Sequence, residues 1–159
     1  MKSKKKTNAA RILDGLGIRY ELKEYPVDLN DLSAVHVAAA VGMDVRMVFK
    51  TLVARGDKSG VLMACIPGDG ELDLKALASV SGNKKVEMVH LREVQGLTGY
   101  IRGGCSPLGA KKEYPVYLDQ SSDSWDTIAI SAGRRGEQIL LHPQDLVTAV
   151  KAVVAPITR

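Results

Sequence analysis

Glycine, serine and cationic side chains gather in one segment of the chain, residues 98–112, which reads Thr-Gly-Tyr-Ile-Arg-Gly-Gly-Cys-Ser-Pro-Leu-Gly-Ala-Lys-Lys. Gly103, Gly104 and Gly109 lack Cβ atoms, so a ligand can approach their peptide N–H groups closely and the backbone can adopt left-handed conformations. Pro107 fixes one φ angle and stiffens the loop. The segment is therefore a candidate for holding a ligand, although glycine count alone favours a structural loop at the corner of a sheet.

Two other kinds of side chain could take part in chemistry beside this loop. Lys50 follows the apolar pair Val48-Phe49 and opens a predicted strand, where a lysine can be held against the sheet, although a lysine in that position is ordinarily just solvated. Cys105 lies within the loop near cations that could favour its thiolate, but the sequence assigns it no histidine partner. Cys65 lies inside an apolar strand and is predicted to belong to the core.

Spacing excludes several familiar sites. The glycine-rich segment has neither the Gly-Lys-Ser/Thr ending of a nucleotide phosphate-binding loop nor the G-x-G-x-x-G pattern of a dinucleotide site. The acidic run 69–73 has Leu74 and Val80 where a calcium loop needs glycine and glutamate. His90 and Glu93 are three residues apart, but no second cluster completes a metal site. The sequence therefore predicts neither a metal site nor a bound cofactor, and it contains no recognisable catalytic triad.

Length and composition predict one well-buried core. The chain has 159 residues and a mass of 17.1 kDa, and 45% of its residues are hydrophobic, which is enough for one core and short for two. Its net charge is +4 with a pI of about 9.1, and such a balance permits contact with phosphates without requiring it. We expect a basic N-terminal tail over residues 1–6 and a single domain over residues 7–159.

The N-terminal region and the cysteines bear on localisation. Asn8, Arg11 and Asp14 interrupt the apolar stretch that a signal peptide would need after its basic start. No apolar run approaches the roughly 20 residues required to span a bilayer. The two isolated cysteines suit a reducing compartment better than a disulfide framework. Together these features predict a cytoplasmic protein that does not contact a membrane.

The hydrophobic pattern predicts helices that bracket a strand-rich middle. The run Gly56-Asp57-Lys58-Ser59-Gly60 has the composition of a hairpin turn between two apolar strands. Hairpin-like spacing favours a mixed or mainly antiparallel sheet over a regular βαβ series, so we expect an α+β domain. Helices are predicted near residues 8–16, 33–41, 73–80, 91–97 and 143–153, and strands near residues 18–25, 50–55, 61–66, 85–89, 115–118, 127–131 and 138–141.

Three of these motifs, Lys50-Thr51-Leu52, Thr98-Gly99-Tyr100 and the run 103–109, closely resemble the YbaK/EbsC family of Cys-tRNA(Pro) deacylases, relatives of the editing domain inserted in bacterial prolyl-tRNA synthetases. The resemblance covers nearly the whole chain in order, because it continues through residues 72–75, 84–88, 131–136 and 143–146. It implies a strongly curved, mixed and largely antiparallel sheet, a half-barrel surrounded by helices. It also implies trans-editing hydrolysis of mischarged Cys-tRNA(Pro) at the acceptor end of the tRNA, with prolyl-tRNA synthetase as a candidate partner.

The resemblance also implies roles for individual residues. The family's essential lysine falls on Lys50, its tyrosine after the first strand on Tyr25, and its carbonyl-binding glycine loop on Gly103 and Gly104, with Ser106 and Gly109 as further members of the loop. The glycine amides would stabilise the charge that develops on the carbonyl oxygen, and Lys50 would supply a fixed cation. The attacking group is either water or the thiol of the substrate's own cysteine, which proximity would activate.

Departures from the family pattern leave the amino-acid specificity open. Cys105 stands where isoleucine is usual, Ala132 where glycine is commoner, and Gln138 where the family has an acid. Alternatives are a deacylase of the same fold for Ala- or Ser-charged tRNA and a non-enzymatic regulator, although the helix-turn-helix expected of a regulator is not visible. Aromatic residues are only 4% of the chain, so phosphate contacts are expected to exceed base stacking in any binding of tRNA.

Overall fold

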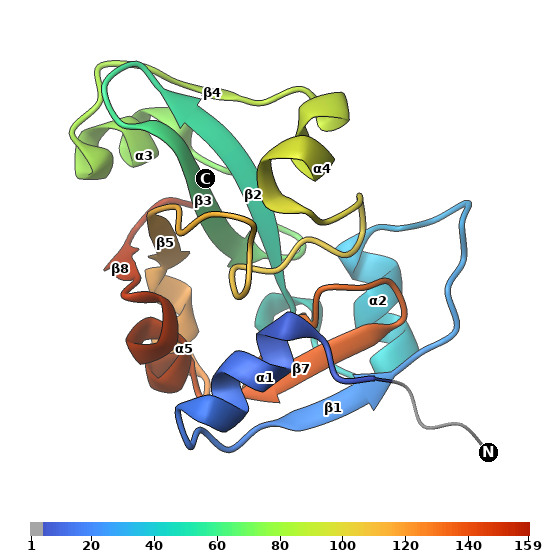
Figure 1. Ribbon diagram of the computed structural model, residues 1–159. Helices are drawn as coiled ribbons and strands as arrows, with labels where there is room; N and C mark the ends of the chain where they lie inside the picture. The colour runs from blue at the N-terminus through green and yellow to red at the C-terminus, as the bar shows by residue number, and fades with distance from the viewer. Residues whose placement is uncertain (1–4) are drawn as a thin grey trace.

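The computed structural model describes residues 5–159 and shows an α+β arrangement (Figure 1). Within that range the elements are, in chain order, α1 (Asn8–Gly15), β1 (Glu21–Glu24), α2 (Ala34–Val41), η1 (Val45–Met47), β2 (Phe49–Gly56), β3 (Gly60–Pro67), α3 (Leu74–Ser81), β4 (Val86–Met88), α4 (Leu91–Thr98), β5 (Val116–Asp119), η2 (Gln120–Ser124), β6 (Ile128–Ser131), β7 (Glu137–Leu141), α5 (Pro143–Val150) and β8 (Val153–Ala155), where η marks a 3₁₀ helix. Lys2 and Lys4 of the predicted basic tail lie outside the described residues. The predicted division into residues 1–6 and 7–159 stays a prediction.

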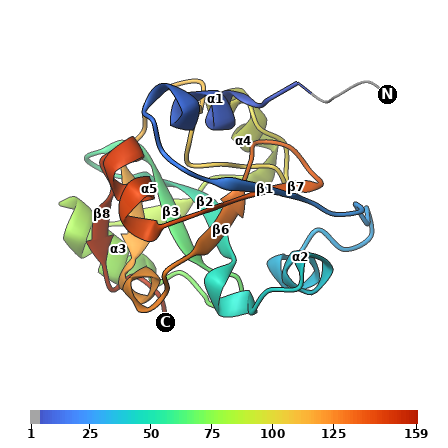
Figure 2. The ribbon, with the colours of Figure 1, turned by 90° about the horizontal axis from the view of Figure 1, so that it is seen from below.

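The strands form two sheets, which Figure 2 shows from below. β1, β7 and β6 make an antiparallel sheet in that order, and β4, β2, β3, β5 and β8 make a mixed sheet in which β5 runs parallel to both of its neighbours. The predicted mixed and largely antiparallel pairing is confirmed. The predicted strongly curved half-barrel is wrong, because neither sheet is strongly curled. β7 pairs with β1 on its outer side, so the β6–β7 hairpin and β1 form a sheet that is separate from the larger one. An isolated bridge between Val48 and Ala129 joins the two sheets just before β2.

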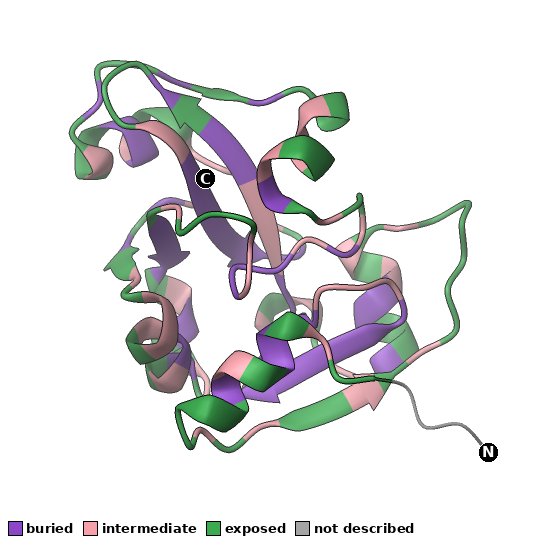
Figure 3. Ribbon diagram, in the orientation of Figure 1, coloured by how far each residue is buried: buried purple, intermediate pink, exposed green. Residues whose placement is uncertain are grey.

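The hairpin β2–β3 is the centre of the larger sheet. Its pairing runs from Phe49 opposite Pro67 to Gly56 opposite Gly60, as the turn composition predicts. β3 is buried along nearly its whole length, whereas Lys50 and the two residues after it on β2 are only half-buried (Figure 3). This part of β2 is therefore available to line a site.

The helices begin and end where capping residues predict. The side chains of Thr7, Ser33 and Asp73 accept hydrogen bonds from the first turns of α1, α2 and α3. Gly42 and Gly82 close α2 and α3 in the left-handed conformation that glycine adopts without strain. None of the helices within residues 5–159 combines the length and the hydrophobicity that a membrane span requires.

The C-terminal helix is shorter than the hydrophobic pattern predicts. The pattern extends it to Val153, but α5 ends at Val150 and the next apolar residues form β8 at the edge of the larger sheet, parallel to β5. Lys151 closes the helix with a φ of 54°, a left-handed conformation that is usually filled by glycine. Because a lysine at this position carries no stop signal, the sequence pattern does not reveal the final strand.

Candidate functional site

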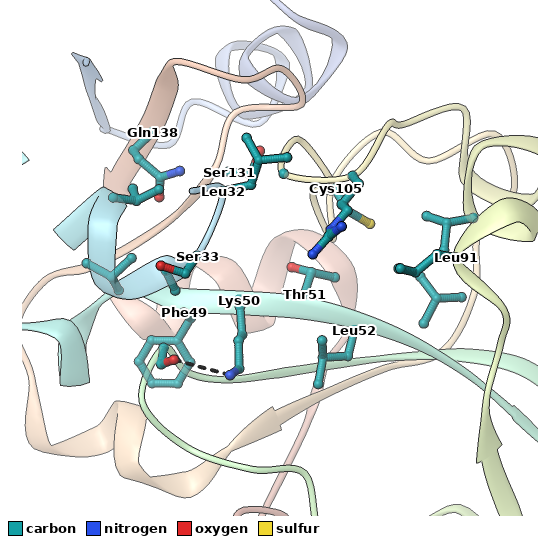
Figure 4. A pocket seen from close by; sticks show the side chains of 18 of the residues that line it. Leu32, Ser33, Phe49, Lys50, Thr51, Leu52, Leu91, Cys105, Ser131 and Gln138 are labelled. Carbon is teal, nitrogen blue, oxygen red and sulfur yellow. Dashed lines mark hydrogen bonds between the residues drawn. The ribbon is translucent and has the colours of Figure 1, made fainter. Parts of the chain in front are cut away.

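A pocket of about 370 Å³ opens beside β2, between the start of α2, the segment from β4 into α4 and the glycine-rich loop (Figure 4). Its apolar wall includes Leu52, Val89 and Leu91. The opposite wall is polar and includes Ser131 on β6 and Gln138 on β7. Since β2 belongs to one sheet and β6 and β7 to the other, the pocket lies at the junction of the two sheets.

Lys50 lines this pocket and is fixed by a neutral acceptor. Its Nζ donates a hydrogen bond to the carbonyl oxygen of Gly68 at 3.1 Å, and Figure 4 shows the side chain leaving β2 toward that oxygen. A Cβ on Gly68 would lie 2.7 Å from the Cβ of Ala34, so glycine lets this carbonyl approach the lysine closely. No carboxylate of the described residues forms an ion pair with the ammonium, and its charge is therefore available to a ligand.

The charges of the pocket have one sign. Among its lining residues, all of which lie in the described range, Lys50 and Arg102 carry charge, and neither aspartate nor glutamate is present. Residues 5–159 also contain no group of three His, Cys, Asp or Glu that could hold a metal ion. The pocket therefore favours an anionic or electron-rich ligand over a cation.

A tight turn presents Gly103 to the pocket. The N–H of Gly104 donates to the carbonyl of Ile101 at 2.9 Å, and Gly103 has a φ of 83°. Gly103 lines the pocket, whereas Gly104 is buried behind it, where a Cβ would lie 3.2 Å from the backbone of Arg134. The N–H of Gly103 hydrogen-bonds no other residue of the described chain. Gly103 therefore offers an amide to a ligand, while the amide of Gly104 is already used to close the turn.

The two other predicted loop members lie outside the pocket lining and hold the loop together. Ser106 is fully buried, and its Oγ accepts a hydrogen bond from the N–H of Leu108 at 3.2 Å. A Cβ on Gly109 would lie 2.9 Å from the hydroxyl oxygen of Tyr100 and 3.1 Å from the Cβ of Asn8. Glycine at position 109 thus lets the loop pack against α1.

Tyr25 also lies outside the pocket lining. It follows β1 directly, is half-buried, and packs against the apolar cluster that includes Val37 and Leu140. Its backbone N–H donates to the carbonyl of Gly136 at 3.0 Å, which extends the pairing of β1 with β7. The substrate-binding role expected of Tyr25 stays a prediction.

Cys105 lies in the glycine-rich loop, where the sequence assigns it no histidine partner. This residue lines the pocket, but burial raises the pKa of its thiol to about 11, so the thiol stays protonated at neutral pH despite the nearby cations. The predicted core position of Cys65 is confirmed, since it is fully buried on β3. Neither cysteine is an activated nucleophile.

Gln138 and Ser131 are pocket residues that the sequence did not bring together. They face each other across the β6–β7 hairpin, directly paired in the register. Gln138 is 5% exposed, and its side-chain oxygen has no hydrogen-bond partner within the described chain. The signal that could have found them is a polar pair at the turn end of a hairpin whose other paired positions are apolar.

Comparison with known proteins assigns the family. Residues 31–149 match the model of the aminoacyl-tRNA editing domain. The chain belongs to this family. The editing domain is 46% identical over 157 residues to the Enterococcus faecalis protein named "Putative Cys-tRNA(Pro)/Cys-tRNA(Cys) deacylase EbsC", covering 99% of this chain and 96% of that one. It is 33% identical over 76 residues to the proline–tRNA ligase of Thermosipho africanus, covering 48% of this chain and 13% of the ligase.

Solved structures agree with this assignment. The editing domain superposes on the crystal structure of "hypothetical protein APE2540" with a TM-score of 0.87 and 25% identity, covering 96% of this chain and 99% of that one. It superposes on "a putative trans-editing enzyme for prolyl tRNA synthetase" with a TM-score of 0.81 and 27% identity, covering 96% of this chain and 97% of that one. The resemblance to the YbaK/EbsC family expected from the sequence is thereby confirmed.

Proposed function

We propose that this editing domain hydrolyses the ester bond of a mischarged aminoacyl-tRNA, with Cys-tRNA(Pro) as its substrate. The observation that carries the proposal is a pocket in which a fixed ammonium, that of Lys50, and an unpaired amide, that of Gly103, line the same space. The full-length similarity to EbsC supports the choice of substrate, because that relative is named for Cys-tRNA(Pro) and Cys-tRNA(Cys).

The pocket suits an ester that is already activated. Attack on the carbonyl carbon places negative charge on the carbonyl oxygen, which the Gly103 amide and the Lys50 ammonium stabilise. The C–O bond to the ribose then breaks, and the ribose oxygen leaves as a hydroxyl with the proton that the attacking water or thiol gives up. The attacking group comes from water or from the substrate's cysteine thiol, because the protonated Cys105 supplies no nucleophile.

Gln138 is proposed to receive the α-ammonium group of the substrate. Its buried side-chain oxygen lacks a partner, and the pocket lining offers no carboxylate for a cation. We expect Gln138→Leu to raise the KM for aminoacyl-tRNA about tenfold, since a hydrogen bond to a charged group contributes about 1.5 to 3 kcal/mol. Steady-state deacylation measures this change, with Gln144→Leu on the exposed surface of α5 as the matched control. An unchanged KM in Gln138→Leu would remove the residue from substrate recognition.

The experiment that tests the function is deacylation of a panel of purified substrates, namely Cys-tRNA(Pro), Ala-tRNA(Pro), Ser-tRNA and Cys-tRNA(Cys). We expect Cys-tRNA(Pro) to be hydrolysed fastest. Faster hydrolysis of Ala- or Ser-charged tRNA would keep the deacylase activity and change its substrate, whereas hydrolysis of none would overturn the proposal. Prolyl-tRNA synthetase is the proposed partner, supported by the partial match to a proline–tRNA ligase, and its addition to the assay is expected to lower KM.

A further inference from the structure

Arg102 is the second cation of the pocket, and its side chain is unengaged. It lines the pocket from the glycine-rich loop and is exposed. Within the described residues its guanidinium makes no hydrogen bond or ion pair. A cation that neither pairs with an acid nor packs into the core is available to an anion from outside.

The backbone that carries Arg102 is held firmly. Its carbonyl oxygen accepts a hydrogen bond of 2.7 Å from Nε of Arg135, and the turn around it is closed by the bond from Gly104 to Ile101. A Cβ on Gly103 would lie 3.5 Å from the same Nε, so the Arg135 guanidinium lies beside the amide that faces the pocket. A second guanidinium thus stands next to Arg102, and no acidic side chain in the described chain forms an ion pair with either.

The charge of the substrate decides what Arg102 binds. An aminoacyl ester carries a positive α-ammonium group, so the ester end alone cannot balance a pocket that holds Lys50 and Arg102 without an acid. The nearest negative charge of an aminoacyl-tRNA is the phosphodiester that joins its last two nucleotides, one ribose away from the ester. Guanidinium groups bind phosphate through paired N–H donors.

We infer that Arg102, supported by Arg135, binds this terminal phosphodiester and leaves Lys50 to act on the ester. The inference rests on the proposed function, which supplies the ester. It assigns the two pocket cations to two groups of the same tRNA end. It also makes Arg102 a binding residue and Arg135 a residue that positions it.

The test measures binding of the uncharged trinucleotide CCA, which carries phosphodiesters, and of adenosine, which carries none. Arg102→Gln is expected to weaken CCA binding about tenfold, because a charged hydrogen bond of this kind is worth about that factor or more. The slope of log K against log salt should become shallower by about 0.7, the share of one single-strand phosphate. Adenosine binding should change much less than CCA binding. Arg102→Lys should retain part of the affinity, since it keeps the charge.

The matched control is Arg19→Gln, which removes an exposed arginine outside the pocket lining and should bind CCA as the wild type does. Thermal unfolding of each variant checks that the fold is retained. Three outcomes would overturn the inference: no binding of CCA by the wild-type protein at low salt, wild-type affinity in Arg102→Gln, or equal losses for CCA and adenosine.

Failure of the proposed function is distinguishable from failure of this inference. Arg102-dependent binding of CCA without hydrolysis of any substrate in the panel would refute the deacylase and keep the phosphate site. Hydrolysis of Cys-tRNA(Pro) with the same KM in Arg102→Gln and wild type would refute the phosphate site and keep the deacylase.

Discussion

Lys50→Ala is expected to abolish deacylation, with kcat falling at least about 100-fold, because removing one group that stabilises a developing oxyanion costs about 2.7 to 4 kcal/mol. The fold should remain, since Lys50 is half-buried and gives up one hydrogen bond, to the Gly68 carbonyl, worth about 0.5 to 1.5 kcal/mol. Single-turnover deacylation of Cys-tRNA(Pro) measures the chemical step, and thermal unfolding measures stability.

Lys75→Ala provides the matched control for this variant. Lys75 is exposed on α3 and does not line the pocket, so its loss removes the same charge without touching the site. Turnover near the wild-type value in Lys50→Ala would remove the lysine from the mechanism. An equal loss in Lys75→Ala would attribute the effect to net charge.

Gly103→Ala is expected to lower kcat about 10- to 100-fold and the free energy of unfolding by about 1 kcal/mol. The added Cβ would meet Leu32 and Arg135 at ordinary contact distances of 3.4 and 3.5 Å, so crowding is not the cause. The cause is the φ of 83°, which alanine tolerates poorly, so that relaxation of the peptide turns its N–H away from the carbonyl oxygen. Deacylation kinetics and denaturant unfolding on the same preparation separate the two effects.

Gly60→Ala is the control that separates the effect of backbone strain on stability from the effect of the Gly103 amide on activity. Gly60 has a φ of 74° in the β2–β3 turn, and a Cβ there would meet nothing within 4 Å. It should lose similar stability and keep its activity. If both variants lost activity equally, or if Gly103→Ala kept the wild-type kcat, the amide of Gly103 would have no role in the reaction.

Local signals predicted most of the elements but not their assembly into sheets. Capping residues such as Ser33 and Gly42 act within a few residues of each helix end, so the sequence displays them directly. The edge strand β8 and the division into two sheets depend on which distant segments pair, and no short pattern encodes that choice. Lys151 illustrates this limit, because it adopts a left-handed φ shortly before β8, which pairs with β5, and nothing in the residue type signals that conformation.

The candidate site was predictable where the family motif and the geometry coincide. Lys50 and Gly103 both line the pocket, and the roles that the resemblance implies for them stay predictions. Gly109 belongs to the same motif, yet it lets the loop pack against α1. The sequence does not distinguish these two roles, because a glycine required for close packing looks the same as one that faces a ligand. The sequence marked Gln138 only as a departure from the family's acid, because the burial of its unpartnered side-chain oxygen is a property of the fold.

The bridge between Val48 and Ala129 joins the two sheets beside the pocket. Binding of a ligand in the pocket is therefore expected to stabilise the association of the two sheets. A ligand that contacts β2 on one side and β7 on the other links the two sheets. It must therefore dissociate before the sheets separate during unfolding. By mass action, a ligand that binds only the folded state at 100 times its Kd adds about 2.7 kcal/mol to the free energy of unfolding. Substrate analogues that bind this pocket in the folded protein alone will thus make the protein more resistant to heat and proteolysis.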